Sequence, residues 1–152
     1  MNMEYAVERC SKEVIEEIKP LLEAHYEEIA RNQDKIKLNP DYDLYAKLDE
    51  LGMLHGVSAR ADGELIGYFL SIVGPNMHYK DHLMAKNDIM FIRKDYRNGL
   101  TPVRLLKYAE ETLKARGVSV MYLNVKLAHD FGRLMEYLGW VETERIYEKI
   151  LI

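Results

Sequence analysis

Hydrophobic residues recur along the chain with two different periods. Apolar residues every three or four positions are typical of amphipathic helices, whereas alternating or short continuous apolar runs are typical of strands. The helical spacing predicts four helices, over residues 11–29, 41–51, 103–116 and 130–138. The strand pattern predicts six strands, over residues 3–9, 54–60, 64–73, 87–92, 118–125 and 140–151.

Turn-forming residues refine this outline. The pair Asp62-Gly63 suits a tight turn and predicts a hairpin between the second and third strands. The run Gly74-Pro75-Asn76 is expected to end the hairpin's second arm. Pro20 removes a backbone N–H inside the first helix and predicts a kink or break near Lys19. The predicted order is β-α-α-β-β-β-α-β-α-β, a mixed α/β (α+β) sheet with helices on both faces.

Length and composition indicate one domain over residues 1–152, with no internal repeat or linker. No apolar run approaches the ~18–20 residues of a membrane span. The N-terminus lacks the apolar stretch of a signal peptide. The single cysteine, Cys10, cannot form an intramolecular disulfide or a cysteine-rich zinc site. We therefore expect a cytoplasmic protein without a membrane partner.

The charge is unevenly distributed. The chain has 21 Lys and Arg against 25 Asp and Glu, a net charge of −4 that makes nucleic acid a poor partner. Residues 1–50 hold 7 basic and 13 acidic side chains, whereas residues 80–107 hold 7 basic and 3 acidic ones. Such a division is typical of an ordinary solvated surface. It also suits a molecule in which one end attracts cations and the other attracts anions such as phosphates.

The turn before the third helix, Asp95–Pro102, is one place where an anion could bind. A helix start offers unpaired N–H groups and the positive end of a dipole. Gly99 permits close backbone approach, and Arg97 and Arg104 supply charge. The alternative interpretation is a plain turn with Pro102 in the first helical position.

The order of elements and several motifs resemble the GCN5-related N-acetyltransferases, the GNAT superfamily. Tyr96–Gly99, Val103–Glu110 and Arg116–Val118 are similar to the region that binds coenzyme A pyrophosphate in that family. Arg133–Trp140 is similar to the family's L-Y-E-K-L-G-F motif, with Met135 in the place of its tyrosine. His129–Gly132 resembles a stretch found in GNAT-like proteins of bacteriophages.

The resemblance implies an N-acetyltransferase that moves an acetyl group from acetyl-CoA to a primary amine of a small molecule or of a protein lysine or N-terminus. A homodimer is compatible with it, and a phage protein would act in the host cytoplasm. The alternative is a GNAT-fold binding or regulatory protein, host-directed if phage-encoded, with weak or no transferase activity. The coenzyme-binding residues it implies are Met90, Phe91, Ile92, Arg97, Asn98, Gly99, Leu100, Thr101, Val103 and Arg104.

Acetyl transfer needs a general base to deprotonate the amine. The candidates are His129, whose unperturbed pKa lies near ~6.5, Asp88 and His78. No metal is expected, because the five histidines have no ligand spacing. The family places the acceptor near the first helices and the connection before the fourth strand. Candidate acceptor-site residues are Tyr26, Tyr42, Tyr45 and Tyr79, with Glu23, Glu27 and Glu28 as acids that attract a cation.

Overall fold

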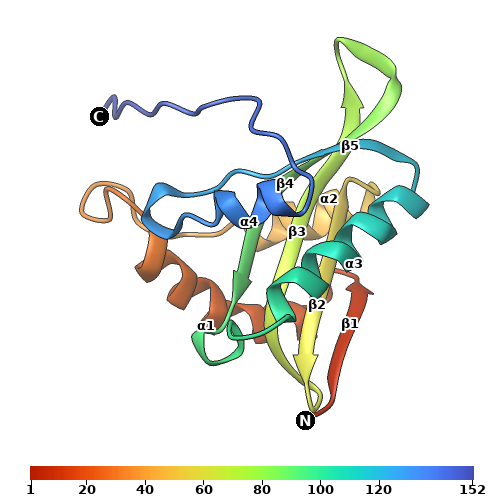
Figure 1. The fold of residues 1–152 in the computed structure, drawn as a ribbon. Helices are drawn as coiled ribbons and strands as arrows, with labels where there is room; N and C mark the ends of the chain where they lie inside the picture. The colour runs from red at the N-terminus through yellow and green to blue at the C-terminus, as the bar shows by residue number, and fades with distance from the viewer.

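The computed structural model describes all residues 1–152. They form one five-stranded sheet with helices on both faces (Figure 1). The sheet order is β1-β2-β3-β4-β5, antiparallel throughout except for the parallel pair β4 and β5. The strands are β1 (Met3–Glu8), β2 (Leu54–Ala61), β3 (Glu64–Asn76), β4 (Tyr79–Ile92) and β5 (Val118–Tyr122). The helices are α1 (Lys12–Ile29), α2 (Tyr42–Glu50), α3 (Thr101–Ala115), α4 (Gly132–Tyr137) and the 3₁₀ turns η1 (Lys94–Tyr96) and η2 (Leu127–His129).

Side chains at the helix starts explain where α1 and α2 begin. The Ser11 hydroxyl accepts the N–H of Val14, and the Asp41 carboxylate accepts the N–H of Leu44. Each replaces a backbone partner that the first helical turn lacks. The predicted break at Pro20 is wrong, because α1 continues through this exposed position to Ile29. No helix in the structure combines the length and apolar character needed to cross a membrane.

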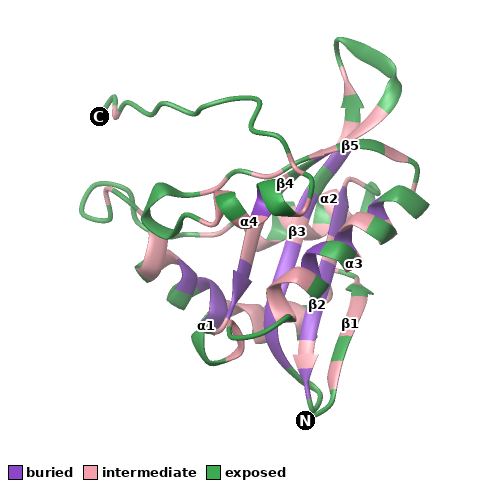
Figure 2. Ribbon diagram, in the orientation of Figure 1, coloured by how far each residue is buried: buried purple, intermediate pink, exposed green.

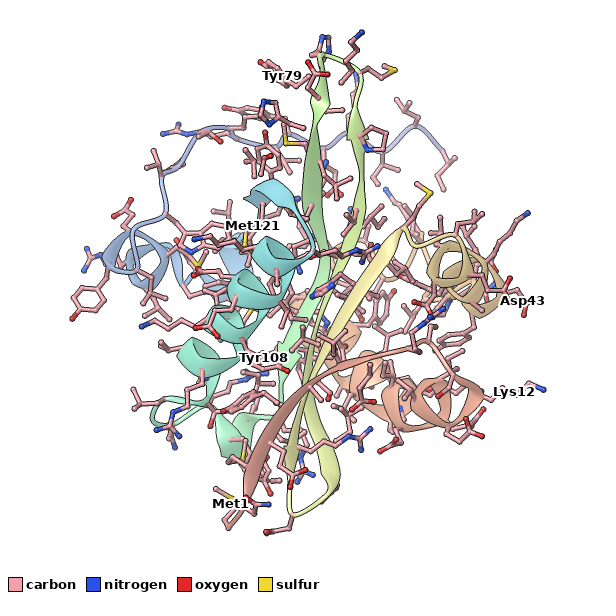
Figure 3. The ribbon with its side chains drawn as sticks, turned by 90° about the vertical axis from the view of Figure 1, so that its right-hand side faces the viewer. Met1, Lys12, Asp43, Tyr79, Tyr108 and Met121 are labelled. Carbon is pink, nitrogen blue, oxygen red and sulfur yellow. The ribbon has the colours of Figure 1, made fainter.

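The two faces of the sheet are packed unequally. Viewed along the sheet, α3 covers one face, and α1 and α2 cover the other (Figure 3). The α3 face buries a cluster of 13 apolar residues, to which α3 contributes Leu105, Leu106 and Leu113 and α4 contributes Met135. The α1 face buries a cluster of only four. Burying one large aliphatic side chain stabilises a fold by about 1.5–3 kcal/mol, so the α3 face supplies most of the core.

The arms of the central hairpin are longer than the sequence pattern predicts. β3 continues beyond Val73 to Asn76, and β4 begins at Tyr79, in a segment that the pattern assigns to a polar connection. The two strands pair up to Asn76 and Tyr79, and the tip projects beyond the sheet, with exposed residues (Figure 2). Cross-strand hydrogen bonds therefore extend both strands into a polar sequence.

The predicted last strand, 140–151, is wrong. The chain after α4 forms no ladder and runs as an exposed tail (Figure 1), so the outer edge of β5 has no partner. The tail is directed away from that edge, and Glu148 accepts a hydrogen bond from Asn32 in the α1–α2 loop at 3.3 Å. At the base of the tail, Trp140 stays half-buried, and its Nε1–H donates to Glu110 of α3 at 2.9 Å.

Candidate active site

A cleft opens where β4 and β5 separate. The two strands pair only from Leu83 to Lys86 of β4, so residues 87–92 are unpaired on that edge. The N–H of Arg93 donates to Ile66 of β3 at 2.9 Å. Since successive N–H groups in a strand point to opposite edges, those of Met90 and Ile92 face the open edge. This segment is the Met90–Ile92 stretch that the sequence analysis assigns to coenzyme binding.

The cleft has a volume of about 830 Å³ including its open mouth. It extends between α1 on one side of the sheet and α3 and α4 on the other. Its wall is mostly apolar, with Phe91 of β4, Leu106 of α3 and Phe131 before α4. Its polar side chains are His25 and Glu28 of α1, Arg97 and His129.

The turn between β4 and α3 lies at one end of the cleft. Gly99 has φ +91°, a left-handed conformation that favours glycine. The backbone N–H groups of five residues in and after the turn make no hydrogen bond: Asn98, Gly99, Leu100, Thr101 and Val103. Pro102 has no N–H, and no side chain caps α3. Unpaired N–H groups at a helix start favour an anion, as the sequence analysis predicts.

Unlike these N–H groups, the side chain of Arg97 already has hydrogen-bond partners within the protein. Its two terminal nitrogens donate to the carboxylate of Glu28 at 2.5 and 2.7 Å, and its Nε–H donates to the carbonyl of Ile92 at 2.6 Å. Its guanidinium also lies over the ring of Phe91, 5.2 Å from the centroid. The hydrogen bond from Arg97 holds the pKa of Glu28 below its usual range. The guanidinium that the sequence analysis assigns to phosphate is thus bound to α1.

The rest of the basic segment is partly neutralised within the protein. Arg93 pairs with Glu64 at 2.8 Å and with Asp95 at 2.9 Å. Arg104, on the first turn of α3, is exposed and has no carboxylate within 4 Å. Among the arginines assigned to coenzyme binding, Arg104 is therefore the one with a free guanidinium.

Asp88 lies on β4 just beyond the point where β5 separates. It is the extra residue of a bulge, because Leu70 of β3 pairs with Ile89 and the next residue pairs with Asn87. The side-chain amide of Asn87 donates to the carbonyls of Leu70 and Ile89 and holds the bulge. A bulge re-aims the side chain at its position. The exposed carboxylate of Asp88 accepts the hydroxyl of Tyr45 of α2 at 2.5 Å.

The other two base candidates differ in position. His129, at the end of η2, is exposed on the cleft wall and makes no hydrogen bond with its side chain. The adjacent Asp130 accepts the N–H of Gly132 at 2.8 Å at the start of α4. His78 is next to Tyr79, at the tip of the β3–β4 hairpin (Figure 3), and does not line the cleft. Of the three candidates, His129 alone lines the cleft, whereas Asp88 lies outside its lining, where β4 and β5 separate.

The position of the family's tyrosine offers no hydroxyl. Met135 is buried and belongs to the α3-side core, although it lines the inner wall of the cleft. Tyr137 is 87% exposed and does not line the cleft. Of the four tyrosines considered for an acceptor site, only Tyr45 approaches the separation of β4 and β5. Tyr26 donates instead to the carbonyl of Ile36 at 2.8 Å and closes a loop.

His25 is a cleft residue that sequence reasoning considered only as a metal ligand. It is 7% exposed, and its ring stacks on that of Phe91 with 5.0 Å between the ring centroids. Its Nδ1 lies 3.3 Å from the Tyr68 hydroxyl. Its Nε2 has no partner in the protein. Burial lowers the pKa of His25 to about 4, so the imidazole is neutral at pH 7. The available signal was the spacing of His25 and Glu28, three residues apart on the buried face of α1.

The buried imidazole makes stability depend on pH. Its pKa is about 4 in the folded protein and about 6.5 in the unfolded chain. Unfolding therefore takes up a proton as the pH falls below 6.5. We expect the free energy of unfolding to fall by about 2 kcal/mol through this group between pH 7 and pH 5.

Urea unfolding of the wild type and of His25→Gln at both pH values tests this expectation. The pH dependence of His55, whose burial also lowers its pKa, is common to both proteins and cancels in the comparison. Equal slopes in the two proteins would contradict the assignment.

No group of three or more His, Cys, Asp or Glu side chains is placed to hold a metal ion.

Comparison with known proteins identifies the fold. No family model matches the sequence, and no curated protein matches it significantly. Solved acetyltransferases match along the whole chain. Ribosomal-protein-alanine N-acetyltransferase from Brucella melitensis biovar Abortus 2308 superposes with a TM-score of 0.72 at 17% identity, covering 99% of each chain.

Two further structures match similarly. An aminoglycoside acetyltransferase from an uncultured soil metagenomic sample, in complex with sisomicin, has a TM-score of 0.76 at 12% identity, covering 99% of this chain and 96% of that chain. A predicted acetyltransferase with acetyl-CoA, from Clostridium acetobutylicum, has a TM-score of 0.72 at 14% identity, covering 99% and 97%. The chain has the mixed α/β fold of the GNAT acetyltransferases, which confirms the predicted fold class apart from the last strand.

Proposed function

We propose that this protein is an acetyl-CoA-dependent N-acetyltransferase acting on a primary amine of a small molecule or a protein. The observation that carries the proposal is a single cleft lined by the open edge of β4 and by Arg97 and Pro102, in the turn that holds the unpaired N–H groups. The likeness to acetyltransferases, one of them solved with acetyl-CoA, supports it.

The residues of the cleft fit coenzyme A. The five N–H groups from Asn98 to Val103 suit a pyrophosphate, with the free guanidinium of Arg104 beside them. The N–H groups of Met90 and Ile92 suit an extended, amide-containing chain that adds to the edge of β4. The bonds from Arg97 to Glu28 and to Ile92 fix the turn relative to this edge. In this proposal Arg97 holds the turn in place and does not bind phosphate.

Two groups of this chain would act on the reacting atoms. When bound, acetyl-CoA supplies a thioester whose carbonyl carbon the amine attacks. Asp88, at the separation of β4 and β5, would take a proton from the bound ammonium, directly or through water, so that the neutral amine can attack. The free N–H of Met90 would stabilise negative charge on the carbonyl oxygen. His129 on the cleft wall is the alternative base.

One observation favours a second candidate, a coenzyme-binding protein without transfer. Met135 is buried where the family has its tyrosine, so no side chain at that position can protonate a departing thiolate. Such a protein would bind acetyl-CoA in the same cleft but would release no free coenzyme A thiol with any amine.

Calorimetry with acetyl-CoA, followed by thiol release over a panel of amines, tests the proposal. We expect binding with a Kd below about 100 µM and release of coenzyme A with at least one amine. Binding without thiol release would support the second candidate. No binding at millimolar acetyl-CoA would exclude both.

Gly99→Val is expected to weaken acetyl-CoA binding about tenfold. A residue with a Cβ is strained by about 1–2 kcal/mol at left-handed φ, so the turn relaxes and its N–H groups turn away from the anion. The matched control is Gly117→Val at the other end of α3, where φ is also +91° and the surroundings are equally open. Equal affinities of the two variants, measured by calorimetry, would contradict the role of the turn.

A further inference from the structure

A second pocket lies on the α1 face of the sheet, separate from the cleft. It occupies about 710 Å³ including its mouth, between α1, α2 and strands β2, β3 and β4. Its wall is mostly hydrophobic, with Ile15 and Ile18 of α1, Leu70 of β3 and Ile89 of β4 among its residues. An open space with such a wall suits an apolar group.

The packing of this face explains the space. α2 buries none of its residues, and the α1 face has a buried cluster of only four apolar residues, against 13 on the α3 face. Protein interiors are usually close-packed. An apolar wall between two helices and a sheet is a place where an apolar group can be buried.

The charged side chains around the pocket indicate which charge a bound molecule would need. Two of its carboxylates are already paired: Glu8 with Arg60 at 2.8 Å and Asp49 with Arg9 at 2.8 Å. The hydrogen bond from Arg60 lowers the pKa of Glu8. Asp88 does not line the pocket, but it contacts Tyr45 of the pocket wall and accepts only the neutral hydroxyl of that residue. Its negative charge is the unpaired one, and it suits a cationic amine.

This carboxylate lies next to the pocket wall, at the separation of β4 and β5. Tyr45 lines the pocket and donates to Asp88, and Ile89, the next residue of β4, also lines it. Asp88 itself lies just beyond the last pairing of β4 with β5. An amine held at Asp88 would therefore have its nitrogen at the separation of the strands and its body toward the pocket.

We infer that the acceptor is a primary amine carrying an apolar group, aromatic or branched aliphatic, which occupies the pocket between α1 and α2. This inference rests on the proposed function and specifies its substrate class. It disfavours short hydroxylated amines and polyamines, because these would leave the apolar wall unfilled and place polar groups against it. A second cation would also meet no unpaired carboxylate in the pocket.

The test measures amine binding to the full chain by calorimetry, in the presence of coenzyme A, and does not depend on turnover. The probes are 2-phenylethylamine, ethanolamine and putrescine. We expect 2-phenylethylamine to bind about tenfold or more tightly than the other two. Equal or tighter binding of ethanolamine or putrescine would overturn the inference.

A pair of variants localises the binding. Ile15→Trp fills the pocket and is expected to reduce 2-phenylethylamine affinity about tenfold, with acetyl-CoA affinity unchanged. Ile72→Trp, on the exposed part of β3 outside the pocket, is the matched control and should change neither affinity. Binding that Ile15→Trp leaves intact would overturn the inference. Failure of acetyl-CoA to bind the wild type would instead overturn the proposed function.

Discussion

Replacing Asp88 with asparagine is expected to lower kcat for amine acetylation by a factor of about 10² to 10⁴, the usual contribution of a general base. The amide keeps the shape of the side chain and can still accept the Tyr45 hydroxyl, but it cannot take a proton from the amine. Acetyl-CoA affinity should stay within about twofold, because the turn before α3 is untouched. Steady-state thiol release and calorimetry measure the two quantities.

Two comparisons make this result specific. Asp81→Asn changes an exposed carboxylate on the same strand, far from the separation of β4 and β5, and should leave kcat unchanged. His129→Gln tests the other candidate on the cleft wall. If His129→Gln abolishes turnover and Asp88→Asn does not, the base is His129 and the assignment to Asp88 is wrong.

Arg97→Met is expected to reduce the free energy of unfolding by about 2–3 kcal/mol. The change keeps the aliphatic length and removes every hydrogen bond to Glu28 and Ile92, which leaves the Glu28 carboxylate unpaired. Truncating one partner of a fully buried pair costs about 3–5 kcal/mol. The two side chains are 20% and 18% exposed, so solvent screens part of this loss. Urea unfolding at pH 7 measures it.

The control is the neighbouring arginine with its own two carboxylate partners. Arg93→Met removes bonds to Glu64 and Asp95, whose side chains are 68% and 58% exposed, and should cost less than about 1 kcal/mol. Adding Glu28→Gln to Arg97→Met should restore part of the stability, because no charge is then left unpaired. Equal losses for Arg97→Met and Arg93→Met would contradict the structural role of Arg97.

The fold was predictable where local pattern and tertiary structure agree. Helical spacing and a capping side chain locate α1 and α2, and the turn at Asp62-Gly63 locates the β2–β3 hairpin. The predictions were wrong where distant partners decide the outcome. Pairing with β3 extends β4 into a polar segment, and the segment 140–151 has an apolar pattern but no strand beside it. A single chain's periodicity carries no information about such partners.

For the candidate site, the positions of the backbone groups were more predictable than the contacts of the side chains. The N–H groups at Asn98–Val103 follow from the order of elements, because a strand, a turn and a helix start fix them. The role of Met90–Ile92 was available only through the resemblance to the GNAT family. The partner of a side chain does not follow from the position of its residue in the sequence. The guanidinium of Arg97 reaches Glu28, which is 69 residues away in the sequence. His25 likewise enters the cleft because α1 packs across Phe91.

The indole of Trp140 gives this chain a built-in optical reporter. It is the single tryptophan, and its N–H bonds Glu110 and so ties the end of α4 to α3. These helices carry Leu106, Leu134 and other residues of the cleft wall. A change in their spacing alters the solvent exposure of the indole and with it the wavelength of its emission. An occupant of the cleft that changes this spacing would therefore be detectable by intrinsic fluorescence in the unlabelled protein.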